Sequence, residues 1–311
     1  MKEKKSRKTA WIIAGIIIAW LFLFSLASIF DNDSTEISSK NKIAIVPIQG
    51  EISIAGSSGF VIPSDGASST SIVKNLEQAE KDNSVKAIIL EINSPGGTVV
   101  ASEEIANKVK SIDKPVIAWI REIGTSGAYW IASSSDRIIA DPLSITGSIG
   151  VIGSYLEFSK LLEKYGIRYE SLATGRYKDL ASPFKELTQE ERILLQDKLN
   201  IIHNAFVDEI ATNRNLPREQ AASLATGIFY IGKEAKQLGL VDELGDKQLA
   251  IDRAKQLAGI EEAEIIRYEQ KRSLFDLLGD VSSKFSYYLG RGIGFELASK
   301  LEEPGLEISA K

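Results

Sequence analysis

Ser126 stands in the stretch REIGTSGAYWIASSSD, just before a glycine and an aromatic run with the composition of a helix. A serine in this position can cap the helix with its side-chain oxygen, which is a common use of serine there. It can also act as a nucleophile, if a base takes its proton and N–H groups stabilise the oxyanion that follows. The amide of Gly127 is one candidate donor, because a helix N-terminus leaves its first N–H groups unpaired. Both interpretations fit the spacing.

A second set of exposed amides is expected where the apolar segment VKAIILEIN ends in SPGG. The glycines Gly96 and Gly97 would let another peptide backbone approach closely, because they carry no Cβ. The alternative interpretation of Pro95-Gly96-Gly97 is an ordinary turn, since proline and glycine dominate turns.

The proton acceptor is the harder requirement, because the chain has one histidine. His203 lies far along the chain, within an amphipathic pattern over residues 189–213, which favours a partly exposed helix position. A Ser-His-Asp triad is therefore disfavoured, and a Ser-Lys pair is the main remaining arrangement. A lysine base needs a pKa roughly three units below its ordinary value, which burial away from carboxylates can provide. Lys178 is one candidate, because small residues surround it in LATGRYKDLASPF.

The first thirty residues differ in composition from the rest of the chain. Residues 1–8 carry five cations and one acid, and the twenty residues 11–30 carry no charge, which is the length of a membrane-spanning helix. The positive flank predicts a cytoplasmic basic tail over 1–10, a transmembrane anchor over 11–30 and an extracytoplasmic remainder. A cleaved signal peptide is the alternative, although its apolar region is normally about 7–15 residues. A polar linker over 31–41 follows.

The remaining chain alternates β-branched apolar segments with amphipathic segments, which predicts an α/β domain with mostly parallel strands. Strands are expected at KIAIVPIQGEISI, VKAIILEIN, KPVIAWI and DRIIADP, with helices between them. A helix is expected over 154–167, a strand over 168–175 and one long helix over 189–213. Residues 55–70 are rich in serine and glycine and predict a loop.

Composition excludes several classes of protein. A formal charge of -5 and a pI near 5.3 argue against nucleic-acid binding. The absence of cysteine excludes disulfides and thiolate metal or redox sites. Apolar residues at helical spacing after Lys271 predict an amphipathic C-terminal extension, assigned to 261–311. It either packs on its own domain or docks on a neighbouring subunit or on the membrane surface.

Five motifs occur in a fixed order: INSPGG, TSGAYWIA, TGSIGVI, GRYKD with SPF, and GLVDELG. Together they resemble the signal peptide peptidase SppA family in its short bacterial form with a single anchor. The resemblance covers about residues 42–260, where it implies the protease domain. It also implies a ClpP/crotonase-like fold, a repeated β-β-α superhelix, carrying a Ser-Lys protease of the S49 type.

The resemblance further implies roles for individual residues. The family nucleophile corresponds to Ser126, and its general base corresponds to Lys178. The serine that orients this lysine corresponds to Ser148. The oxyanion-hole amides correspond to those of Gly97 and Gly127.

The implied function is that of a membrane-anchored serine endopeptidase, which degrades remnant signal peptides after signal peptidase releases them. The implied location is the cell membrane, with one pass, a cytoplasmic N-terminus and an extracytoplasmic catalytic domain. No cofactor, metal or nucleotide is implied, and the expected partners are peptide substrates, the membrane and further copies of the chain in a homo-oligomer. Two alternatives keep the same fold. One is a crotonase-type acyl enzyme, usually cytoplasmic, and the other is a catalytically silent membrane scaffold, expected to lack the serine or the lysine.

Overall fold

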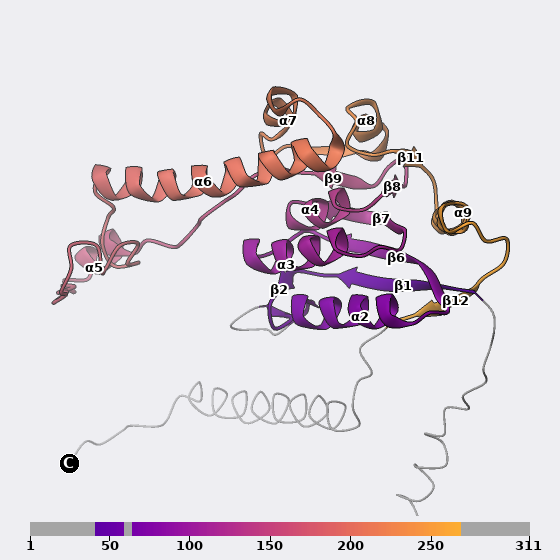
Figure 1. The fold of residues 1–311 in the computed structure, drawn as a ribbon. Helices are drawn as coiled ribbons and strands as arrows, with labels where there is room; N and C mark the ends of the chain where they lie inside the picture. The colour runs from indigo at the N-terminus through magenta and orange to yellow at the C-terminus, as the bar shows by residue number, and fades with distance from the viewer. Residues whose placement is uncertain (1–40, 59–63, 269–311) are drawn as a thin grey trace, which may run out of the picture. The chain divides into compact units, whose positions relative to one another are not determined.

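The structure is a computed structural model that describes residues 41–58 and 64–268 (Figure 1). The expected anchor over 11–30 lies outside these ranges, and so do residues 269–311 of the expected C-terminal extension. Among the helices in the described ranges, none combines the length and the apolar character needed to cross a bilayer.

The described part of the chain alternates strands and helices, as the sequence pattern predicts. In chain order the elements are β1 (Lys42–Gln49), β2 (Ile52–Ser53), β3 (Ser57–Ser58), β4 (Ser64–Asp65), β5 (Ala67–Ser68), α2 (Ser69–Lys81), β6 (Val85–Ser94), α3 (Val99–Lys110), β7 (Val116–Thr125), α4 (Gly127–Ser133), β8 (Arg137–Ala140), β9 (Ile145–Gly147), α5 (Ser159–Lys164), α6 (Gln189–Arg214), α7 (Arg218–Leu224), β10 (Phe229–Ile231), α8 (Gly232–Gln237), β11 (Glu243–Leu244), α9 (Lys247–Ala258) and β12 (Glu264–Arg267).

One eight-stranded sheet contains most of these strands, with the central order β10-β9-β7-β6-β1-β12. β1, β6 and β7 pair in parallel, as strands joined through crossover helices do. β7 divides its pairing between two neighbours: residues 117–120 pair with β8, and residues 123–125 pair with β9. The end of β9 therefore lies beside the end of β7. β12 also belongs to the sheet, where it pairs with β1. It lies within residues 261–311, which the sequence assigned to the C-terminal extension.

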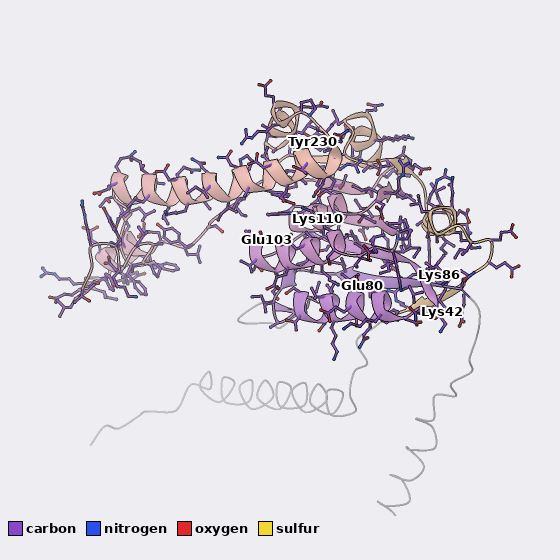
Figure 2. The ribbon with its side chains drawn as sticks, in the orientation of Figure 1. Lys42, Glu80, Lys86, Glu103, Lys110 and Tyr230 are labelled. Atoms are coloured by element: carbon purple, nitrogen blue, oxygen red, sulfur yellow. The ribbon has the colours of Figure 1, made fainter. Side chains whose placement is uncertain are left out.

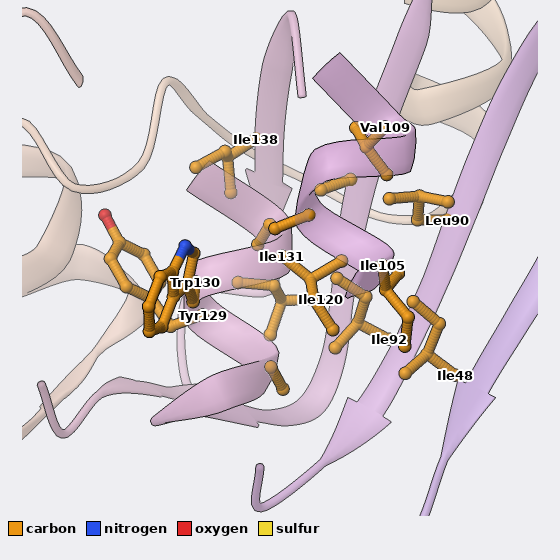
Figure 3. Close-up of a cluster of buried hydrophobic side chains, with 14 of the residues drawn as sticks. Ile48, Leu90, Ile92, Ile105, Val109, Ile120, Tyr129, Trp130, Ile131 and Ile138 are labelled. Carbon is orange, nitrogen blue, oxygen red and sulfur yellow. The ribbon is translucent and has the colours of Figure 1, made fainter. Parts of the chain in front are cut away.

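The two faces of this sheet bury separate apolar clusters. On one face Ile88, Leu90 and Ile92 of β6 pack in a cluster with residues of α2, α3, α4 and α6. On the other face Ala87 and Ile89 pack in a cluster with residues of α9. Figure 3 shows part of the larger cluster between the sheet and the helices α3 and α4. Neighbouring residues of each strand point to opposite faces of the sheet, and both faces are buried. The sequence of each parallel strand is therefore a continuous apolar run.

Helix α6 rests on the domain through its C-terminal half. Phe206 stacks on Trp130 of α4 with ring centroids 4.7 Å apart, and Ile210 is fully buried. Lys110 at the end of α3 (labelled in Figure 2) pairs with Glu209 of α6. The N-terminal half of α6 extends beyond the sheet (Figure 1).

Residues 154–187, here called the arm, connect the loop after β9 to α6 and do not join the sheet. The helix expected over 154–167 forms only as α5, which is shorter than expected, and the strand expected over 168–175 does not form, so the strand prediction was wrong. A strand needs a neighbour with free N–H and C=O groups, and the arm bonds only to itself and to the first turn of α6 within the described structure.

Tyr129 connects the core to the segment after α8. The side chain is fully buried, and its hydroxyl donates to the Leu240 carbonyl at 2.8 Å. Burial raises the pKa of this phenol well above its ordinary value, so the hydroxyl stays protonated.

Tyr129→Phe leaves the Leu240 carbonyl unpaired and is expected to lower the free energy of unfolding by about 1–3 kcal/mol, measured by urea denaturation. Tyr165→Phe, on the exposed arm, is the matched control. Equal stability of the Tyr129→Phe and Tyr165→Phe variants would contradict a stabilising role for the hydrogen bond between Tyr129 and Leu240.

Candidate active site

Ser126 lies at the turn between β7 and α4 in a backbone conformation that serine rarely adopts, with φ 53° and ψ −124°. Its N–H donates to the Gly147 carbonyl at 2.8 Å, and its carbonyl accepts from the Trp130 N–H at 3.0 Å. Such conformations cost about 1–3 kcal/mol, persist where the surroundings enforce them, and cluster at functional sites. Here the end of β9 and the first turn of α4 provide the enforcing contacts.

The hydroxyl of Ser126 is free of protein partners in the described part of the chain. The residue occupies the N-cap position of α4, but its side chain makes no capping hydrogen bond. Ser68, the N-cap of α2, behaves differently, because its hydroxyl accepts from the Ser71 N–H. The capping interpretation of the Ser126 hydroxyl was therefore wrong, and the hydroxyl remains available as a nucleophile.

Two glycines allow the backbone to close around Ser126. A Cβ placed on Gly97 would lie 1.9 Å from the Ile52 carbonyl oxygen. A Cβ placed on Gly127 would lie 2.1 Å from the Ser102 hydroxyl oxygen. Both distances are far below any real contact, so the observed backbone excludes a side chain at either position.

The two glycines lie close to each other, and neither amide is bonded within the described part of the protein. Ile52 donates to the Gly96 carbonyl and accepts from the Thr98 N–H, both at 2.8 Å, which forms a parallel bridge to Gly97. The N–H of Gly97 therefore points away from Ile52. The Gly97 nitrogen lies close to Gly127, because a Cβ on Gly127 would lie 3.4 Å from it. Among the described residues, neither amide has a protein acceptor. Two amides without protein acceptors in the described residues thus lie beside the serine.

Side chains tie the SPGG turn to the strand that carries the serine. The hydroxyl of Thr125 donates to the Pro95 carbonyl at 3.0 Å. The Ile123 N–H donates to the side-chain oxygen of Asn93 at 3.2 Å. These contacts fix the relative position of the two segments at the carboxyl ends of β6 and β7.

A cavity of about 970 Å³ opens beside the serine. Its wall contains four of the five residues predicted from the sequence, namely Ser126, Gly97, Gly127 and Ser148. Ser148 follows β9, and its hydroxyl donates to the Gly227 carbonyl at 3.2 Å. The pairing of β9 with β7 thus brings Ser148 to the cavity that holds the serine.

Lys178, the fifth predicted residue, does not line this cavity. It is exposed on the arm, at a turn in which its N–H donates to the Gly175 carbonyl at 3.1 Å. Asp179 beside it pairs with Lys185 at 2.9 Å. A single chain therefore brings together the predicted nucleophile and both predicted oxyanion amides, but not the predicted base.

His203 lies in the cavity wall, which its position in an amphipathic pattern did not reveal. Its Nε2 donates to the Ala225 carbonyl at 2.8 Å, which joins α6 to the loop after α7. No hydrogen bond links it to Ser126, so the described residues form no Ser-His pair.

Sequence reasoning also missed Ser102, which lies under Gly127, because no local motif marks it. The described ranges hold no group of acidic or histidine side chains suited to a metal ion.

The strained serine, the two neighbouring amides without protein acceptors in the described residues and the parallel sheet form the arrangement expected of a serine hydrolase on an α/β domain. Residues 108–261 match Peptidase family S49, and residues 60–139 match the Clp protease family. The chain belongs to Peptidase family S49 and is a serine protease.

Individual relatives agree with this assignment. A protein of Methanocaldococcus jannaschii named as a protease is 36% identical over 291 residues, which cover 90% of this chain and 91% of the relative. A protein of Enterococcus faecium named as a signal peptide peptidase SppA is 33% identical over 241 residues, which cover 76% of this chain and 70% of the relative. The solved structure of a mutant of the 1510-N membrane-bound stomatin-specific protease matches with a TM-score of 0.50 and 16% identity, over 75% of this chain and 99% of that one. At that identity the likeness concerns the fold alone.

The close packing at Gly127 makes this position sensitive to substitution. In Gly127→Ala the new Cβ meets the Ser102 hydroxyl, so the amide must move away from the position predicted for an oxyanion-hole donor. We expect kcat/KM for peptide hydrolysis to fall by about 10²–10³-fold, the cost of losing one oxyanion donor. Gly153→Ala, whose Cβ would lie 3.6 Å from its nearest neighbour, is the matched control and should retain activity. Wild-type kcat/KM in a folded Gly127→Ala protein would contradict this placement of the amide.

Proposed function

We propose that the protein is a membrane-anchored endopeptidase with a Ser126–Lys178 dyad, which degrades remnant signal peptides after their release by signal peptidase. The observation that carries the proposal is the free hydroxyl of Ser126, held in a strained conformation beside the unpaired amides of Gly97 and Gly127. A silent scaffold would have no need to maintain that strain. A crotonase-type acyl enzyme would have no need for the serine hydroxyl.

The proposed reaction is acyl transfer through the serine. Neutral Lys178 takes the hydroxyl proton of Ser126 as Oγ attacks the carbonyl carbon of the scissile peptide bond. The amides of Gly97 and Gly127 donate to the oxygen that becomes negative. The lysine ammonium then protonates the leaving amine, the C–N bond breaks, and an acyl-enzyme remains. Water attacks this ester as Lys178 takes its proton, the bond between the acyl carbon and Ser126 Oγ breaks, and Lys178 returns the proton to Oγ. Ser148 helps to orient the lysine.

The walls of the cavity support an extended, apolar substrate. Ile52 already occupies one side of Gly97, so a substrate strand would pair on the opposite side, next to Ser126. Val151, Leu199 and other apolar side chains line the space beyond. Remnant signal peptides are apolar, and the proposed anchor over 11–30 would keep the cavity close to the membrane that contains them.

The position of the arm supports a homo-oligomer in which the dyad forms between two copies. Lys178 lies outside the cavity of its own chain. The arm also exposes large apolar side chains, among them Tyr155, Leu156, Leu161, Ile167 and Leu172. Exposed apolar surface on this scale marks an interaction site. We infer that the arm of one copy packs on the next copy and brings Lys178 to its serine.

Removing either member of the dyad tests the chemistry. Ser126→Ala and Lys178→Ala should each lower the rate of peptide hydrolysis by at least about 10³-fold, as loss of a nucleophile or its base does in other serine proteases. The measurement uses the full chain in detergent and an internally quenched peptide with alanine and leucine around the cleaved bond. Circular dichroism checks that both variants fold. Full activity in Lys178→Ala would exclude this lysine as the base.

Mixing the two inactive variants tests where the dyad forms. In oligomers co-expressed from equal amounts of Ser126→Ala and Lys178→Ala chains, about one interface in four combines an intact serine with an intact lysine. We therefore expect about a quarter of the wild-type activity to return. An inactive mixture that forms oligomers would instead indicate a dyad within each chain.

A further inference from the structure

Lys178 lies in a charged segment without forming an ion pair. Its neighbour Asp179 bonds instead to Lys185, at 2.9 Å. The same ammonium bonds to Glu191 of α6, at 2.8 Å. Lys185 thus bridges two carboxylates, while Lys178 has no acidic partner in the described part of the chain.

The remaining acids near Lys178 also have other partners. Glu190 pairs with Arg176 and accepts a hydrogen bond from the Tyr177 hydroxyl. Glu186 pairs with Lys160 of α5 at 2.9 Å. Every acidic side chain from 179 to 191 is therefore bonded to a group other than Lys178.

This distribution matters because a carboxylate disables a lysine base. An opposite charge within about 4–6 Å favours the charged form of an ionisable group, by about 1–3 pKa units. A lysine that accepts a serine proton must instead spend time uncharged. Asp179, the adjacent residue, is the carboxylate best placed to interfere.

We propose that Lys185 is a positioning residue of the protease, which binds Asp179 and Glu191 so that neither carboxylate pairs with Lys178. The inference rests on the proposed role of Lys178 as the general base. It assigns to Lys185 no contact with the substrate. Its effect is to keep the charged neighbours of the base in place.

The anchoring of Lys185 supports this role. Glu191 is almost fully buried and belongs to a capping box: it accepts from the Thr188 N–H at 2.9 Å, and its own N–H donates to the Thr188 hydroxyl at 3.2 Å. Hydrogen bonds from Lys185 are the main reason that the pKa values of Asp179 and Glu191 lie below normal. The hydrogen bond to Glu191 is the main reason that the pKa of Lys185 lies above normal. All three groups therefore stay charged around neutral pH, and the start of α6 holds the cluster.

The test is the pH dependence of kcat/KM for Lys185→Met, with the full chain in detergent and the same quenched peptide. Without the Lys185 ammonium, Asp179 is free to pair with Lys178. We expect the acidic limb of the profile to move up by about one pH unit, with activity near pH 7 about tenfold lower and little loss at high pH. The double variant Lys185→Met/Asp179→Asn should return the limb towards its wild-type position, and Lys185→Arg should leave it unchanged.

Lys81→Met is the matched control, because it breaks an exposed ion pair on α2 and frees none of the acids near Lys178. In the cavity wall, the titratable side chains Glu51 and His203 are the same in every variant. If Lys185→Met lowers activity equally at every pH, Lys185 is only structural and the inference fails. Lys185→Gln, which keeps a hydrogen-bond donor, decides the same question if the methionine variant does not fold. Failure of the dyad itself would appear separately, as an active Lys178→Ala protein.

Discussion

The close approach of two backbone segments, residues 94–97 and 125–127, is the constraint on which the site depends. It leaves no room for a Cβ at Gly97 or Gly127, and it brings the two glycines close together. It also coincides with the positive φ of Ser126, whose hydroxyl makes no capping bond. Both segments follow the carboxyl ends of neighbouring parallel strands, where α/β sheets place their ligand sites. The apolar core beneath them therefore serves to hold two short segments in register.

The groups of the proposed reaction differ in how firmly the fold holds them. The serine and the amides lie on the sheet, where hydrogen bonds and buried side chains fix their positions. The lysine lies on an exposed arm, which ion pairs hold to the first turn of α6. A base supplied by a neighbouring copy would make activity depend on assembly, because a chain without its neighbour would lack a complete site. That dependence would confine hydrolysis to the assembled enzyme.

The sequence predicts the rigid part of this site well. Gly97 and Ser126 follow apolar strands, and parallel pairing brings such strand ends together. Ser148 meets them because β9 pairs with β7. The long helix expected over 189–213 forms as Gln189–Arg214. The strands and the long helix depend on local patterns of apolar residues and glycine, which a single sequence displays, whereas Ser148 was assigned only through the resemblance to the SppA family.

The sequence predicts the arm and the far wall of the cavity less well. The apolar residues of 168–175 resemble a strand, but they have no sheet edge to join, and periodicity does not report the absence of a neighbour. The presence of His203 in the cavity wall depends on how α6 crosses the domain, and the role of Ser102 depends on contact with Gly127. Both are tertiary relations between residues far apart in the chain.

The most direct test is the distance between the Ser126 Oγ and the nearest Lys178 Nζ in an experimental structure of the assembled full chain in detergent. The account predicts that a neighbouring copy supplies the lysine, within hydrogen-bond reach of about 2.7–3.2 Å. A nearest Lys178 Nζ beyond about 4 Å in every copy, with another group such as His203 bonded to the serine, would contradict it.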